Sequence, residues 1–138
     1  MKRVLVLALS IVLGLTATAC SDSTGPGASL AGAYTLQTIN GAPLPVYINN
    51  SGNPSTEVVS ERIVINADGS YSGVTRYRDT YLGQQPVLVD SPFTGYWTLS
   101  GSQIVLTETD FPNDPTYGTI SSNQMVLSVF GTSAVYIR

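Results

Sequence analysis

From about residue 30 onward, apolar and polar residues alternate along short stretches that are separated by turn residues. A period of two residues is typical of β-strands that have one buried face and one exposed face. We see no stretch with the 3.6-residue period of an amphipathic helix. The alternation predicts an all-β fold with strands over Gly32–Ile39, Val58–Asn66, Ser70–Arg78, Gln84–Val89, Phe93–Leu99, Gln103–Thr109, Tyr117–Ser121, Gln124–Phe130 and Ser133–Ile137.

Most links between the predicted strands are short turns, such as Asn40-Gly41, Ala67-Asp68-Gly69 and Ser100-Gly101. About eight strands joined in this way can close into a single up-and-down antiparallel β-barrel, which leaves no unpaired edge. A β-sandwich is the alternative, but it needs longer crossover connections. The segment Pro43–Pro54 is rich in proline and turn residues, so we expect it to stay out of the sheet as a lid or an edge.

The first 19 residues have the pattern of a secretory signal peptide. Lys2-Arg3 supplies a positive start, Val4–Leu15 is almost wholly apolar, and small residues follow over Thr16–Ala19. The apolar run is too short for a membrane-spanning helix of ~20 residues. We therefore assign residues 1–19 to a leader, residues 20–29 to a flexible polar tether, and residues 30–138 to the barrel.

The segment Ala17–Cys20 resembles the lipobox of bacterial lipoproteins, although Ala17 stands where leucine is usual. The resemblance implies cleavage before Cys20, a diacylglycerol thioether on its sulfur, and N-acylation, typically with palmitate. Ser21 follows the cysteine, and by the same resemblance the absence of aspartate there favours the outer membrane of the cell envelope. The alternative is an ordinary signal peptide cut after Ala19, which would leave Cys20 as a free thiol.

Composition narrows the possible chemistry. The chain has no histidine and only one cysteine, so a Ser–His arrangement, an internal disulfide and a thiolate metal cluster are all excluded. From Cys20 onward it has four arginines, no lysine and nine acidic residues, which argues against nucleic-acid binding. We find no phosphate-binding glycine loop and no dinucleotide fingerprint. We expect no enzymatic activity, no cofactor and no metal, and the sequence identifies no protein partner.

Several short motifs resemble the small lipocalin-like domains of bacterial lipoproteins. Gly32-Ala33-Tyr34 opens the first strand where lipocalins have Gly-x-Trp, Ala67–Tyr71 matches a hairpin of those domains, Gly95–Gly101 matches another turn, and Tyr136-Ile137-Arg138 matches the end of the chain. The resemblance implies an eight-stranded barrel that is either filled by side chains or holds one small ligand. It would also let Arg138 stack on Tyr34, which replaces the lipocalin tryptophan.

The eight tyrosines and the single tryptophan are the main candidates for ligand contacts, because these rings combine an apolar body with a polar tip. The predicted strand register directs four of them inward, where they would line a cavity for a small apolar or amphipathic molecule: Tyr34, Tyr71, Tyr77 and Trp97. The alternative is that these rings fill a solid core. The protein would then be a structural or protein-interaction module of the envelope, including inhibitor-like roles.

Three groups of charged residues are weaker candidates. Arg76 and Arg78 share one face of a strand and could bind an anion. The alternative is that this face points outward into solvent and that nearby acidic residues balance its charge. Glu57 and Glu61 lie at a predicted strand start, where we expect them to be exposed. The oxygen-rich segment from Glu108 to Asp114 could attract Ca²⁺, but its spacing does not match a known calcium loop.

Overall fold

The computed structural model describes residues 26–129 and 131–138. The predicted leader, Cys20, most of the predicted tether and Phe130 lie outside the described residues. The elements are α1 (Pro26–Leu30), β1 (Gly32–Ile39), β2 (Ala42–Pro43), β3 (Val46–Asn49), β4 (Ser55–Ile65), β5 (Ser70–Thr80), β6 (Val87–Ser100), β7 (Gln103–Glu108), β8 (Thr116–Ile120), β9 (Gln124–Val129) and β10 (Thr132–Ile137).

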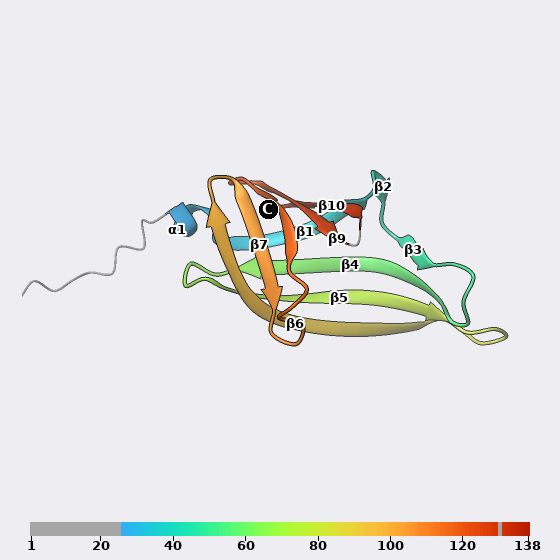
Figure 1. Cartoon of the computed structure of the whole chain (residues 1–138). Coiled ribbons are helices and arrows are strands. Elements are labelled where there is room, and N and C mark those ends of the chain that lie inside the picture. The colour runs from blue at the N-terminus through green and yellow to red at the C-terminus, as the bar shows by residue number, and fades with distance from the viewer. Residues whose placement is uncertain (1–25, 130) are drawn as a thin grey trace, which may run out of the picture.

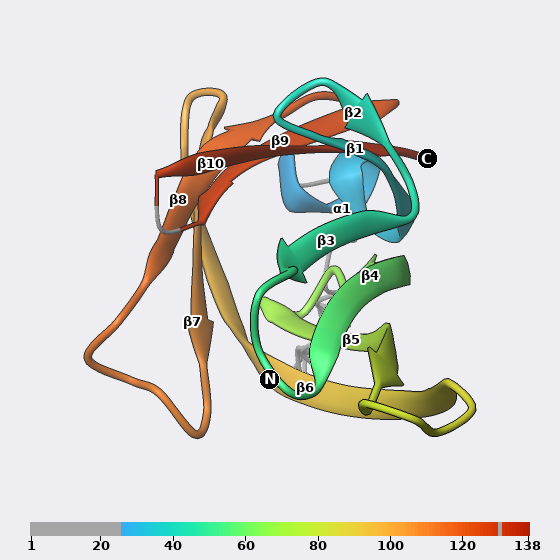
Figure 2. The same ribbon diagram turned by 90° about the vertical axis from the view of Figure 1, so that its right-hand side faces the viewer.

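Eight of the strands form a closed antiparallel ring. From β4 to β10 each strand pairs with the next in the chain, β10 pairs with β1, and β1 pairs with β4. Figure 2 shows this ring from one end, with β3 near the viewer and α1 at the far end. The short strands β2 and β3 are added to β1 and β4 outside the ring. The predicted all-β, up-and-down barrel of about eight strands is therefore confirmed.

The core follows the two-residue period of the sequence. Ile63 and Ile65 of β4, Ile104 and Leu106 of β7, and Leu127 of β9 all point into the barrel and are at most 4% exposed. Each fully buried aliphatic side chain contributes about 1.5–3 kcal/mol relative to an exposed one. Alternation on successive strands therefore supplies both the closure of the sheet and most of its stabilisation.

One strand is longer than the sequence predicts. Only Val87–Val89 of the expected strand Gln84–Val89 are in a strand, and they join the expected strand Phe93–Leu99 in one 14-residue strand, β6 (Val87–Ser100). Pro92 does not interrupt it, because Pro92 pairs with Val74 of β5 on one side, whereas pairing with β7 begins only at Gly95. Proline is tolerated where its missing N–H would face an unpaired strand edge. The first half of β6 thus extends, with β4 and β5, beyond the ring (Figure 1).

The expectation that Pro43–Pro54 stays out of the sheet is wrong. Within it, β3 pairs with β4, with Val46 opposite Val58 and Tyr47 opposite Glu57. The prolines flank this short strand rather than interrupting it, so they cost no ladder hydrogen bond inside it. The segment forms an added edge of the sheet beside the open end of the barrel (Figure 2).

Helix α1 corrects the predicted extent of the tether. Residues 26–29 were expected to be flexible, but they belong to α1, where the Ala31 N–H donates to the Gly27 carbonyl at 3.1 Å. Gly27 lies against Trp97, so close that an added Cβ would be 2.9 Å from the indole ring. The helix therefore packs on one end of the barrel. None of the described residues forms a helix long and apolar enough to cross a membrane.

Candidate functional site

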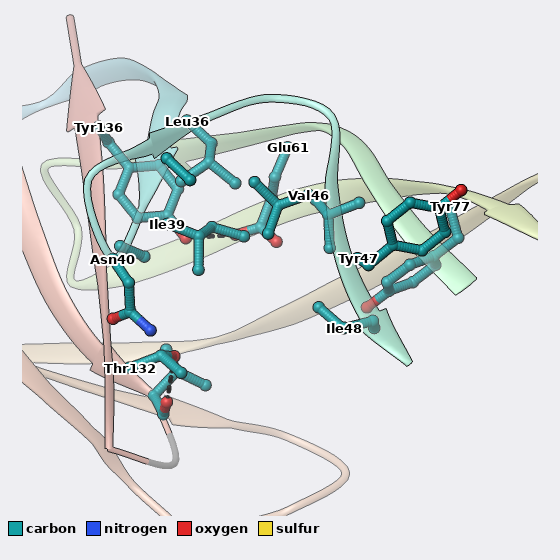
Figure 3. A pocket seen from close by; sticks show the side chains of 14 residues that line it. Leu36, Ile39, Asn40, Val46, Tyr47, Ile48, Glu61, Tyr77, Thr132 and Tyr136 are labelled. Atoms are coloured by element: carbon teal, nitrogen blue, oxygen red, sulfur yellow. Dashed lines mark hydrogen bonds between the residues drawn. The ribbon is translucent and has the colours of Figure 1, made fainter. Parts of the chain in front are cut away.

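The candidate site is an open cavity that lies where β1 and β4 separate. These strands pair only between Gly32–Thr35 and Arg62–Ile65. Beyond these residues β1 pairs with β2, and β4 pairs with β3. Strands β1 and β4 therefore diverge, and an open cavity of about 610 Å³ lies between them. Pockets for small molecules usually measure about 300–1,000 Å³. Figure 3 shows its aliphatic and tyrosine side chains, with Tyr47 and Ile48 of β3 lying beside Tyr77 at one end and Val46 lying beside Glu61.

A register shift helps to shape this cavity. The pairing of β1 with β10 shifts between Leu36 and Thr38, so that Leu36 and Ile39 both line the cavity. In a strand with regular alternation, Ile39 would lie on the opposite face from Leu36. An irregularity of this kind inserts an extra residue and re-aims the side chains that follow it. It adds a second large aliphatic group to the cavity wall.

Glu61 lies at the inner end of the cavity. Its Oε1 accepts a hydrogen bond of 2.6 Å from the Tyr136 hydroxyl, and its Oε2 accepts one of 2.7 Å from the Thr75 hydroxyl. Tyr136 is 2% exposed, and burial together with the negative charge of Glu61 raises its pKa. Among the described residues that line this cavity, Glu61 is the only one with a carboxylate or a cationic group.

The expectation that Glu57 and Glu61 are exposed is wrong. Glu61 points into the barrel, and Glu57 is 9% exposed and pairs with Arg78 at 3.0 Å. The sequence held a usable signal for Glu61, because counting back by two from Ile65 and Ile63 reaches it on the same face. Its position near the predicted strand start concealed this, since β4 begins at Ser55, three residues before the expected start.

A second cavity of about 430 Å³ adjoins the first. Both are lined by Glu61, Tyr77 and Tyr136, which stand at their junction. The second cavity adds two further carboxylates and three aromatic rings: Glu108, Asp110, Tyr71, Phe93 and Phe111. Asp110 and Phe111 are exposed, so this cavity also reaches the surface. The combined lining is therefore mostly aliphatic toward β3 and acidic around Glu61 and Glu108.

The charges in the second cavity influence one another. Burial raises the pKa of Glu108, and the negative charges of Glu61 and Asp110 raise it further. Burial, with a smaller effect from Glu108, also raises the pKa of Tyr71. For Tyr77, burial raises the pKa, a hydrogen bond with Thr75 opposes this, and the charges of Glu61 and Glu108 add to the rise. These shifts describe an interior that disfavours additional negative charge.

The four predicted ligand-contact residues fall into two places. Tyr77 lines both cavities and Tyr71 lines the second. Tyr34 and Trp97 pack in the core near α1 and line neither of these cavities. The Tyr34 hydroxyl is 2.9 Å from the Leu30 carbonyl, and Trp97 Nε1 donates to the Asn66 carbonyl at 2.9 Å. These two rings close the barrel end that carries the helix.

Arg138 lies beside Tyr34, as the resemblance implied, but its contacts are polar. Its guanidinium donates to the Ser29 carbonyl at 3.0 Å and to the Ser122 carbonyl at 3.2 Å. Burial raises the pKa of Tyr34, and the charge of Arg138 and a hydrogen bond with it partly oppose that rise. The arginine therefore ties the end of β10 to the helix at the closed end of the barrel.

The remaining charged candidates are paired or dispersed. Arg76 donates to both carboxylate oxygens of Asp90 at 2.6 and 2.8 Å, and Arg78 donates to Glu57. Each arginine therefore already contacts a carboxylate, which disfavours a shared anion site. Within residues 26–129 and 131–138, no group of three or more acidic side chains is arranged to hold a metal ion. This gives no support to a calcium site in the segment that begins at Glu108.

Comparison with known proteins adds little beyond this geometry. No family model matches the sequence, and no curated protein matches it. A solved structure of a lipocalin-like protein from Bacteroides uniformis aligns with 80% of this chain and 98% of that chain, at 18% sequence identity and a TM-score of 0.47. The assignment of a closed eight-stranded barrel rests on the strand pairing described above.

Proposed function

We propose that this chain is a non-catalytic binding protein whose barrel takes up one small apolar or amphipathic molecule. The observation that carries the proposal is the open cavity of about 610 Å³ with mostly aliphatic walls. A ligand tail that leaves water for such a cavity gains about 0.8 kcal/mol for each buried CH₂ group. The added strand β3 forms one rim, where Tyr47 and Ile48 are 55% and 57% exposed and available for contact.

The binding proposal has a direct test in a variant that fills the cavity. Ala134 is 5% exposed and lines the cavity, so the larger side chain in Ala134→Phe would fill the space in which we propose that the ligand binds. Its neighbour Ser133 is exposed on the outer face of the same strand, and Ser133→Phe is the matched control. The neutral dye N-phenyl-1-naphthylamine should fluoresce on binding to the wild-type chain and to Ser133→Phe, but not to Ala134→Phe. Equal binding by both variants would refute the proposed site.

We also propose that Cys20 carries a lipid anchor that holds the protein in the cell envelope, at the outer membrane. The support is the sequence pattern around Cys20. Helix α1 and strand β3 lie at opposite ends of the molecule (Figure 1), so an anchor that precedes α1 would leave the open cavity on the side away from the bilayer. Mass spectrometry of the detergent-extracted protein should find an acylated Cys20, and Cys20→Ser should abolish the modification. An unmodified cysteine in the wild-type protein would refute the anchor.

A protein-interaction role is the second candidate, and one observation favours it. Val87, Leu88 and Val89 of β6 are 49%, 58% and 42% exposed, and the edge of β6 that faces away from β5 beside them pairs with no strand among the described residues. Such apolar residues can form a contact surface for another protein. If this role is the main one, the dye should not bind the cavity, and Leu88→Ser should abolish association with the partner. Binding of the dye as described above would favour the ligand-binding role.

A further inference from the structure

We propose that the ligand carries a positive charge, as an amine-bearing amphiphile does, and that Glu61 is the residue that selects and anchors this group. The inference rests on the proposed binding function and names the ligand class for the same cavity. The apolar tail would lie toward β3 and the cationic head would lie at the inner end of the cavity. Figure 3 shows Glu61 beside Val46, with its carboxylate joined to the Tyr136 hydroxyl by a hydrogen bond.

The first argument is the unbalanced charge of Glu61. Glu61 is partly buried, and a carboxylate that loses part of its hydration is stabilised when hydrogen bonds or an opposite charge compensate for that loss. Glu61 accepts one hydrogen bond on each oxygen, from Tyr136 and Thr75. Both ion pairs found among the described residues lie elsewhere, as Arg76–Asp90 and Arg78–Glu57. A cationic ligand would supply the opposite charge that Glu61 lacks.

The second argument is the chemistry of the adjoining cavity. Its charged lining residues among those described are Glu61, Glu108 and Asp110, and all three are acidic. Five of its lining residues are aromatic, and aromatic rings attract cations through their negative faces. The raised pKa of Glu108 has the charges of Glu61 and Asp110 among its causes, so the field in this cavity is negative. Such an interior favours an ammonium group and opposes a carboxylate, including that of a fatty acid.

The test compares three probes that each have ten carbon atoms in an unbranched chain: decylammonium, 1-decanol and decanoate. Each displaces N-phenyl-1-naphthylamine at pH 7, below its aggregation concentration. The protein is the chain from residue 20 onward with Cys20→Ser, since the closed ring and its core lie within residues 26–138 and no detergent is then needed. We expect decylammonium to bind roughly 10-fold or more tightly than decanol, and decanoate to bind most weakly.

Two variants assign the selectivity to one residue. Glu61→Gln should reduce the preference for decylammonium over decanol to about 3-fold or less while decanol binds as before. Asp90→Asn is the control, because it removes the same charge from an outer position where the Asp90 side chain is 49% exposed. It should leave the preference unchanged. An equal loss in both variants, or an unchanged preference in Glu61→Gln, would overturn the role of Glu61.

A measurement on the wild-type chain keeps the test decisive even if Glu61→Gln does not fold. Nuclear Overhauser effects should connect the CH₂ beside the ammonium nitrogen with Tyr136, and the terminal methyl group with Ile48. The reverse orientation would overturn the proposal. If none of the three probes binds, the proposed function itself fails. If decanol binds as tightly as decylammonium, the binding function stands and only the inference about charge fails.

Discussion

The hydrogen bond between Tyr136 and Glu61 should be a major source of stability in the barrel. The Tyr136→Phe substitution keeps the ring, which is 2% exposed, and removes only the hydroxyl that donates to Glu61 at 2.6 Å. A hydrogen bond to a charged group contributes about 1.5–3 kcal/mol, and the ring leaves no new cavity when it is retained. We therefore expect the free energy of unfolding to fall by about 1.5–3 kcal/mol.

The assay is urea unfolding of the detergent-free chain at pH 7, followed by circular dichroism. For a domain of this size the same loss should lower Tm by roughly 6–12 °C. Tyr117→Phe is the control, since Tyr117 is 60% exposed and its substitution should change stability by less than about 0.5 kcal/mol.

A double-mutant cycle ties the effect to its partner. If the tyrosine acts through Glu61, then Tyr136→Phe should cost much less in a chain that already carries Glu61→Gln, with a coupling energy of about 0.5–3 kcal/mol. A loss below about 0.5 kcal/mol in the single variant, or full additivity in the cycle, would refute the reasoning. Either result would mean that solvent in the cavity satisfies Glu61 as well as the tyrosine does.

Three further predictions concern the interior and its closed end. Burial and nearby negative charges raise the pKa of Glu108 above 4.5 in the folded state. Protonation of Glu108 therefore favours folding, and this contribution to the free energy of unfolding is lost as the pH rises through the folded-state pKa. Glu108→Gln should therefore be more stable than wild type at pH 7, with a difference that shrinks toward pH 4 in urea titrations; a constant difference would contradict this. Gly95→Ala should destabilise the barrel by about 1–3 kcal/mol in the same assay, because its Cβ would overlap the Thr107 carbonyl oxygen, and a neutral effect would contradict that packing. Trp97→Phe should lower the free energy of unfolding by about 1 kcal/mol, because it removes the indole hydrogen bond, yet leave dye affinity unchanged. Tyr77→Ala should weaken dye binding, because Tyr77 lines the cavity. Equal losses of dye affinity in the two variants would contradict the proposed location of the site.

Much of the fold could be predicted from the sequence because its main determinant is local. Alternation of apolar and polar residues specifies which side chains of a strand are buried, and turn residues such as Asn40-Gly41 mark where strands end. The strand Gly32–Ile39 and the hairpin around Asp68 therefore follow directly from the pattern. Ring closure follows once each strand pairs with its neighbour.

The site was harder to predict because it depends on departures from that pattern. The register shift that turns Ile39 inward is set by pairing with β10, which is distant in the sequence. Whether Pro92 can sit within a strand depends on where β7 stops pairing. The position of Glu61, in contrast, could be predicted from the sequence, because the two-residue period places it on the buried face of its strand. The expected strand started too late, since β4 begins at Ser55. The local sequence alone therefore does not specify the register shift of β1 or the point at which β7 stops pairing with β6.

The measurement that tests the central claim most directly is native mass spectrometry of the protein purified from its own host. The wild-type chain should carry a small-molecule adduct that dissociates on activation, and Ala134→Phe, which fills the cavity, should lack it. The adduct should bear an amine if Glu61 anchors the ligand as proposed. A wild-type chain without an adduct under repeated mild purification, or an adduct that persists in Ala134→Phe, would contradict binding in this cavity.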